Sequence, residues 1–172
     1  MSRPLSTGLV VPVDAARQLV APWLDRLPAA GRALPPHVTA LWPFLPAVAA
    51  DDAVERRLQE LLAGARAFPF TLERVAGLAD AVVLVAEPAE PFTALTRLLW
   101  DAWPECPPFG GAYDDIAPHV VVAIDPSTAD RAAIEATLAP RLPLAARAAE
   151  VLLVEEVESG AVRVRRRFSL GA

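Results

Sequence analysis

The residues of this chain best suited to acid–base chemistry are its two histidines, His37 and His119. Each follows a proline and opens an apolar run: residues 36–39 are Pro-His-Val-Thr, and residues 118–121 are Pro-His-Val-Val. A single histidine in such a place is usually a structural residue. Two histidines in matching local frames, with none elsewhere in the sequence, favour a shared chemical role.

Both runs, residues 37–44 and 119–124, are predicted to be buried strands. Side chains two positions apart in a strand point to the same face. Each imidazole therefore shares its face with the residue two positions on, Thr39 in the first run and Val121 in the second. We expect the other face of each strand to pack into a core.

Two imidazoles aimed at one point would suit the cleavage of a phosphodiester. A neutral imidazole can take a proton from water or a ribose hydroxyl, and an imidazolium can give one to the leaving oxygen. The hydroxyl of Thr39 would donate to a non-bridging phosphate oxygen. This chemistry needs no metal ion, and two histidines are a weak ligand set; a carboxylate from Asp114 or Asp115 would have to extend it, which leaves a metal site as a minor alternative.

Apolar spacing, prolines and capping residues predict the elements around the two runs. Strands are expected at 8–13, 37–44, 68–72, 81–86, 119–124, 144–157 and 162–170, and helices at 15–27, 51–64, 91–103 and 127–138. The expected N-caps are Asp14 and Ser127, and residues 51 and 52, both aspartates, are expected to start the second helix. The order strand, helix, histidine strand, helix, strand thus occurs twice, with one extra closing strand.

This order predicts an α+β fold of two pseudo-twofold lobes, each a sheet with helices behind it, around a central groove. We treat residues 1–172 as a single domain of two intertwined lobes, because no low-complexity linker divides the chain. The first motif, residues 37–39, would belong to one lobe, and the second, residues 119–121, to the other.

The composition excludes several classes of protein. A net charge of −5 and a pI of about 5.0 argue against a broad nucleic-acid-binding surface. The single cysteine, Cys106, rules out an internal disulfide and a cysteine-rich zinc site. Residues 1–7 lack the pattern of a signal peptide, and no apolar run approaches the ~20 residues of a membrane-spanning helix. We therefore expect a cytoplasmic monomer that needs no cofactor.

The two motifs, with their surroundings, resemble the 2H phosphoesterases, a family that includes 2'-5' RNA ligase-like proteins and cyclic nucleotide phosphodiesterases. Residues 36–39, running on to 41–44, are similar to the first His-x-Ser/Thr motif of that family and its hydrophobic continuation. Residues 107–114 and 118–123 are similar to the approach to the second motif, and residues 165–171 to the closing strand. The resemblance implies a bilobal fold, His37 and His119 as catalytic residues, and a 2',3'-cyclic nucleotide or RNA end as substrate.

One position departs from the family pattern. The second motif should carry serine or threonine where this chain has Val121. Valine has nearly the shape of threonine but no hydroxyl, so the strand geometry would survive while one phosphate donor is lost. Loss of one oxyanion donor elsewhere raises the barrier by about 2.7–4 kcal/mol, a factor of roughly 10² to 10³ in rate.

Three further residues are candidates for substrate binding. Tyr113 lies in the long loop before the second motif, where it could stack on a base. Arg163 and Arg165 alternate with apolar residues along the last strand, so their guanidinium groups could face the groove and hold phosphate. A solvated, charged edge strand is the alternative explanation for these arginines.

Three functions remain open at this point. The first is metal-independent cleavage or transfer at a phosphodiester by the histidine pair. The second is a nucleotide- or RNA-binding member of the family that is catalytically impaired. The third is an enzyme that uses the same histidines for acid–base chemistry on a small metabolite. A basic groove would favour a nucleotide or RNA, whereas a narrow apolar pocket would favour the third function.

Overall fold

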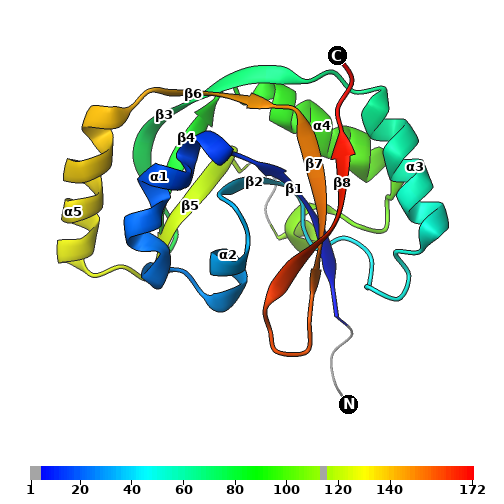
Figure 1. Ribbon diagram of the computed structural model, residues 1–172, viewed down its shortest axis with the longest axis horizontal. Coiled ribbons are helices and arrows are strands. Elements are labelled where there is room, and N and C mark those ends of the chain that lie inside the picture. Colours follow the sequence, from blue (N-terminus) through cyan, green and yellow to red (C-terminus); the bar gives the residue numbers. More distant parts are fainter. Residues whose placement is uncertain (1–4, 113–115) are drawn as a thin grey trace.

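A single curled antiparallel sheet holds the named strands of this protein (Figure 1). The computed structural model describes residues 5–112 and 116–172. In this part of the chain the strands are β1 (Thr7–Pro12), β2 (His37–Leu41), β3 (Phe68–Leu78), β4 (Ala81–Glu87), β5 (His119–Ile124), β6 (Leu144–Ala148), β7 (Glu150–Glu156) and β8 (Val162–Ser169). The α-helices are α1 (Arg17–Val20), α2 (Ala29–Ala33), α3 (Asp52–Ala63), α4 (Glu90–Ala102) and α5 (Thr128–Leu138). Short 3-10 helices are η1 (Asp14–Ala16), η2 (Ala21–Arg26), η3 (Pro108–Gly111) and η4 (Ala139–Arg141).

The strand order, β6-β3-β4-β5-β2-β1-β7-β8, places the two histidine strands at the centre of the sheet. On one side β5 continues through β4 and β3 to β6, and on the other β2 continues through β1 and β7 to β8. The sheet therefore has two four-stranded halves that meet where β2 pairs with β5. The predicted α+β fold with two related halves is confirmed.

The longer helices, α3, α4 and α5, lie behind these two halves, whereas the α2 segment packs with a small cluster on the other face. α3 packs against β8 and α4 against β2, whereas η2 packs against β5. Figure 1 shows α3 and α4 on one side of the molecule and α1 and α5 on the other. None of the helices in the described part of the chain is long and apolar enough to cross a membrane.

The main core lies between the sheet and its helices. The alternate residues of the histidine strands, among them Val38 and Val120, are buried there in the same cluster as Leu62 of α3 and Leu99 of α4. Only small apolar clusters cover the other face of the sheet in the described residues. The imidazoles lie on that second face, because they alternate with the core residues.

One glycine is required by close packing near the first motif. A Cβ on Gly8 of β1 would lie 1.8 Å from a ring carbon of Trp42, which is far inside van der Waals contact, so any other residue would clash. Glycine at this position therefore lets the indole, which directly follows β2, lie against the neighbouring strand.

Several predicted elements are confirmed, with small changes at their ends. The helices expected at 51–64, 91–103 and 127–138 are α3, α4 and α5. The side chain of Asp51 accepts hydrogen bonds from the amides of Ala53 and Val54, and Ser127 accepts one from Asp130, so both act as N-caps.

Three predictions about the elements were wrong. The helix expected at 15–27 is broken into η1, α1 and η2, because Pro22 supplies no N–H to continue the ladder, and Asp14 does not cap it. The first histidine strand ends at Leu41, ahead of Pro43. The strand expected at 144–157 is divided at Ala149: β6 pairs with β3 in one half of the sheet, and β7 pairs with β1 and β8 in the other.

Candidate active site

The candidate site is built on the short ladder between β2 and β5. Val38 is the partner of Val120 in this antiparallel pair. One step along each strand then places His37 opposite Val121, and Thr39 opposite His119. All four side chains share one face, with the histidines on a diagonal, where Cβ atoms are typically about 7–8 Å apart. A local twofold thus relates the two motifs.

The two imidazoles are held in the same way. The Nδ1 atom of His37 lies 2.8 Å from the carbonyl oxygen of Pro35, and Nδ1 of His119 lies 2.8 Å from that of Ala117. A carbonyl oxygen only accepts, so Nδ1 carries the proton in both rings. In the neutral form this leaves Nε2 as the basic nitrogen of each ring. Pro35 and Ala117 each precede a proline, which favours an extended backbone at these two residues and so directs their carbonyl groups toward the rings.

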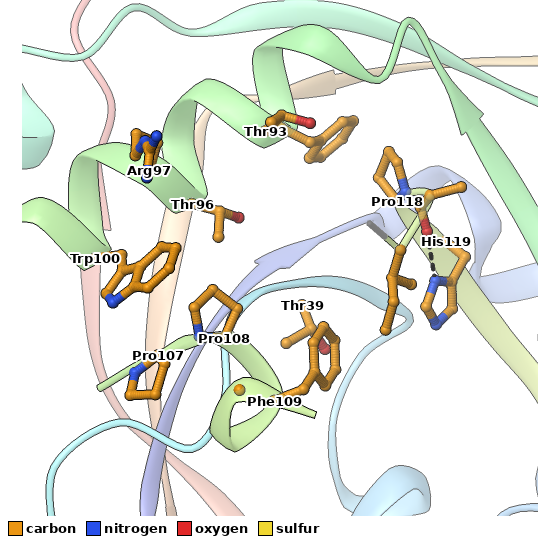
Figure 2. A pocket seen from close by; sticks show the side chains of 14 residues that line it. Thr39, Thr93, Thr96, Arg97, Trp100, Pro107, Pro108, Phe109, Pro118 and His119 are labelled. Carbon is orange, nitrogen blue, oxygen red and sulfur yellow. Dashed lines mark hydrogen bonds between the residues drawn. The ribbon is translucent and has the colours of Figure 1, made fainter. Parts of the chain in front are cut away.

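On the His119 side of the ladder lies a cavity of about 380 Å³, which we call the larger cavity (Figure 2). Thr39 and His119 form its edge, and one face of α4 lines it with Thr93, Thr96 and Trp100. The hydroxyl of Thr96 donates to the carbonyl oxygen of Ala40 at 2.7 Å, which ties α4 to the first histidine strand. The cavity therefore combines hydroxyl groups with an aromatic wall.

Two further side chains give the larger cavity its character. The guanidinium of Arg97 lies 5.6 Å from the centre of the Trp100 ring, a cation–π contact at the cavity wall. Phe109 has a left-handed backbone (φ 52°, ψ 34°), and its amide donates to the carbonyl of Trp42 at 2.6 Å. A bulky residue in this conformation is strained, and such strain is found preferentially at ligand-binding sites.

On the His37 side of the ladder lies a smaller cavity, of about 160 Å³. Its wall includes His37, Val121 and Ile124, and apolar side chains from α1, η2 and the α2 segment complete it. The pKa of His37 is lowered from its ordinary value, mainly because burial disfavours the charged ring. The hydrogen bond to Pro35 opposes this shift, and the nearby charge of His119 adds to it.

The arrangement of the two motifs differs from the one expected from the sequence. We expected the two imidazoles to face one another across one cleft with Thr39 beside them. The structure places all of them on one face but gives each histidine its own cavity, shared with the third residue of the other motif. Tyr113, Asp114 and Asp115 lie outside the described residues.

The two arginines expected at the groove lie at the far edge of one half of the sheet, since β1 and β7 separate β8 from β2. Nε of Arg163 donates to Oε1 of Glu155 at 2.8 Å. Nε of Arg165 donates to Oε1 of Glu55 on α3 at 3.0 Å, and its Nη1 reaches Glu155 at 3.3 Å. Neither arginine lines the two cavities, so their role in substrate binding stays a prediction without support from this geometry.

A β-bulge in the same edge also changes which face the side chains of β8 occupy. The register between β7 and β8 shifts between Leu153 and Val154, opposite Arg165. Side chains before the bulge, such as Val164, lie with the cluster on the histidine face, whereas Phe168 beyond it packs in the main core. The strict alternation assumed for the last strand is therefore interrupted.

The polar face of α4 was not recognised in the sequence. Thr93, Thr96, Arg97 and Trp100 lie at helical spacing beside the apolar stripe that faces the core. A stripe of threonine, arginine and tryptophan on one helix face was the available signal. Its significance depends on which strands α4 covers, and that is set by distant parts of the chain.

No metal centre is built into the described parts of the chain, residues 5–112 and 116–172: no three side chains of histidine, cysteine, aspartate or glutamate converge there. Cys106 is buried, and burial raises the pKa of its thiol, which makes it a poor nucleophile.

Comparison with solved structures shows the same fold in other proteins. Escherichia coli LigT, solved in complex with 3'-AMP, is 18% identical with a TM-score of 0.63, over 99% of this chain and 100% of LigT. The protein TT0787 of Thermus thermophilus is 17% identical with a TM-score of 0.64, over 96% and 97% of the two chains. A protein described as a phosphoesterase is 19% identical with a TM-score of 0.60, over 99% and 100%. A search of curated proteins found no match.

The model of one protein family matches most of the sequence. This is the 2'-5' RNA ligase superfamily, and the match extends over residues 10–160, which include both histidine motifs and both cavities. The chain belongs to the 2'-5' RNA ligase superfamily, the group of 2H phosphoesterases.

Proposed function

We propose that this protein cleaves a phosphodiester in a 2',3'-cyclic nucleotide or at an RNA end, by a two-histidine acid–base mechanism. The observation that carries the proposal is the ladder of β2 and β5, with Val38 opposite Val120. It places His37 and His119 on one face in twofold-related positions, each with Nδ1 bonded to a carbonyl and Nε2 left for chemistry.

The two histidines divide the proton transfers between them. Burial keeps His37 neutral to lower pH than an ordinary histidine, so His37 is the general base. Its Nε2 takes a proton from water, the water oxygen attacks phosphorus, and the bond from phosphorus to one ribose oxygen breaks. His119, as imidazolium, gives its Nε2 proton to that ribose oxygen. No step is assigned to a metal ion.

Thr39 is the oxyanion donor of this site. It lies opposite His119, so its hydroxyl can reach a non-bridging oxygen of a phosphate held between the histidines. The twofold-related position is Val121, which has no proton to donate. We therefore expect a slow enzyme, with one donor where the family pattern has two.

The larger cavity suits the nucleoside. Its volume falls within the usual range of small-molecule sites, about 300–1,000 Å³. Trp100 and Phe109 offer aromatic faces for a base. The hydroxyls of Thr93 and Thr96 donate to the carbonyl oxygens of Ala89 and Ala40, so toward a ligand they act as acceptors. Escherichia coli LigT has been crystallised with 3'-AMP and with ATP, which supports a nucleotide as ligand here.

Two alternatives each have an observation in their favour. The missing hydroxyl at Val121 would suit a nucleotide- or RNA-binding protein that no longer turns over substrate. The apolar wall of the smaller cavity would suit a small metabolite in place of a nucleotide. We also propose that the chain forms one domain of two intertwined lobes.

The direct test is hydrolysis of 2',3'-cyclic AMP by purified protein, with and without a chelator, followed by chromatography of the products. We expect a nucleoside monophosphate to form at the same rate in both samples. The His119→Gln variant, which keeps a polar side chain of similar size, is the matched control and should be inactive. Binding of 2',3'-cyclic AMP without product would favour the first alternative, and neither binding nor product would favour the second.

A further inference from the structure

The smaller cavity differs from the larger one in a way that the shared backbone does not require. In the larger cavity, His119 meets a threonine across the ladder, and further threonines line the wall. In the smaller cavity, His37 meets Val121, and Val121 also packs with an apolar cluster that includes Val83 of β4. Val121, which departs from the family motif, is therefore an apolar residue in apolar surroundings.

The other side chains around the smaller cavity are apolar as well. Beside Val121, its wall is made by Val20, Leu24, Leu27, Leu34 and Ile124. The imidazole of His37 is the one titratable side chain among the described residues that line it. A cavity of about 160 Å³ with such a wall is close in size to the ~150 Å³ apolar cavities known to hold a benzene molecule.

We propose that the smaller cavity binds a compact apolar group carried on the substrate phosphate, and that Val121 determines this specificity. The inference rests on the proposed function, because it assumes that a phosphate lies between the two histidines. The substrate class is then a phosphodiester at an RNA end, in which phosphorus carries the nucleoside on the His119 side and a small alkyl or aryl ester group on the His37 side.

The position of Val121 explains why a hydroxyl is absent there. Without a bound phosphate, the O–H of a threonine at this position would face the apolar wall and lose its hydrogen bonds to water. Valine keeps the same shape and offers a methyl group to the ligand. Each methylene buried in such a cavity should tighten binding about fourfold.

The test measures binding rather than turnover. Dissociation constants of inorganic phosphate, methyl phosphate, n-butyl phosphate and phenyl phosphate are determined by calorimetry with the wild-type protein. We expect n-butyl and phenyl phosphate to bind at least tenfold more tightly than methyl phosphate. In Val121→Thr, the ratio between butyl and methyl phosphate should fall at least threefold, while methyl phosphate itself binds as well or better.

Val48→Thr is the matched control, because it makes the same chemical change at a side chain that is 93% exposed. It should leave all four constants unchanged. Equal affinity for methyl and butyl phosphate would overturn this inference alone and leave the proposed function standing. If none of the four compounds binds and 2',3'-cyclic AMP is not hydrolysed, both this inference and the proposed function are wrong. If Val121→Thr does not fold, Leu24→Gln takes its place, because Leu24 lines the smaller cavity and not the larger one, and it should lower the same ratio.

Discussion

The larger and the smaller cavity are built from equivalent parts, but their walls are chemically unlike. Each joins the histidine of one motif to the third residue of the other, and each is closed by a helical segment and a short covering turn. Hydroxyl groups, an arginine and aromatic rings line the first, whereas aliphatic side chains line the second. The comparison teaches that the duplicated frame fixes where the imidazoles lie, while the residues behind them determine what each can bind.

The largest expected effect concerns the two histidines, which should be equally indispensable despite their unlike surroundings. His37→Ala and His119→Ala should each slow hydrolysis of 2',3'-cyclic AMP by roughly 100-fold or more, because each removes one of the two proton transfers. The double variant should lose little beyond either single one, since the pair acts as a unit. Full activity in either single variant would end the idea of a shared site.

The next effect concerns the third residue of each motif. Thr39→Val should reduce the rate by roughly 10² or more, because it removes the remaining hydroxyl donor. Val121→Thr should raise it by roughly tenfold or more, because it restores the twofold-related donor. Both changes are nearly isosteric, so circular dichroism should show unaltered folding. If Val121→Thr folds normally and gives no gain, the phosphoesterase mechanism loses its main support.

A smaller effect is expected in the pH profile. His37 works only when neutral, and its pKa is lowered by burial, so the acid limb of kcat/KM should lie below the ordinary histidine value of about 6.5. Leu24→Gln would bring a polar group and water to the wall of the smaller cavity. The pKa of His37 should then rise and the acid limb should move to higher pH.

An acid limb at or above about 6.5 in the wild type would contradict the assignment of His37 as the base.

The smallest effect on activity is expected at the edge of the sheet. Arg165 is held by Glu55 and Glu155, and these two carboxylates are nearly buried. Arg165→Ala should therefore lower the melting temperature by several degrees, because it leaves those carboxylates short of a partner. Per folded molecule, kcat and KM should change by less than about threefold. A large rise in KM with normal stability would restore the arginine as a substrate-binding residue.

The sequence predicted those parts of the site that depend on local geometry. The repeated Pro-His-Val pattern and the two-residue period of a strand were sufficient to place Thr39 with His37 and Val121 with His119 on common faces. The main helices followed from their apolar spacing, from the acidic residues that begin α3 and from the cap at Ser127.

What could not be predicted depends on contacts between distant segments. The register of β2 on β5 decides which residue each imidazole meets, and no local pattern encodes it. The strands on either side of Ala149 are both extended and contain apolar residues, so the sequence does not show that the chain crosses there from one half of the sheet to the other. The same holds for the polar face of α4, which becomes a cavity wall only because that helix covers β2.

The most direct test of a phosphate shared by both histidines is an NMR titration with inorganic phosphate. The chain has only two histidines, so the imidazole region of a ¹H–¹⁵N spectrum contains just two ring systems. We predict that the neutral rings are protonated at Nδ1 and that both Nε2 signals shift together as phosphate is added, with one common dissociation constant. A shift confined to one ring, or two clearly different constants, would contradict a phosphate held between the two histidines.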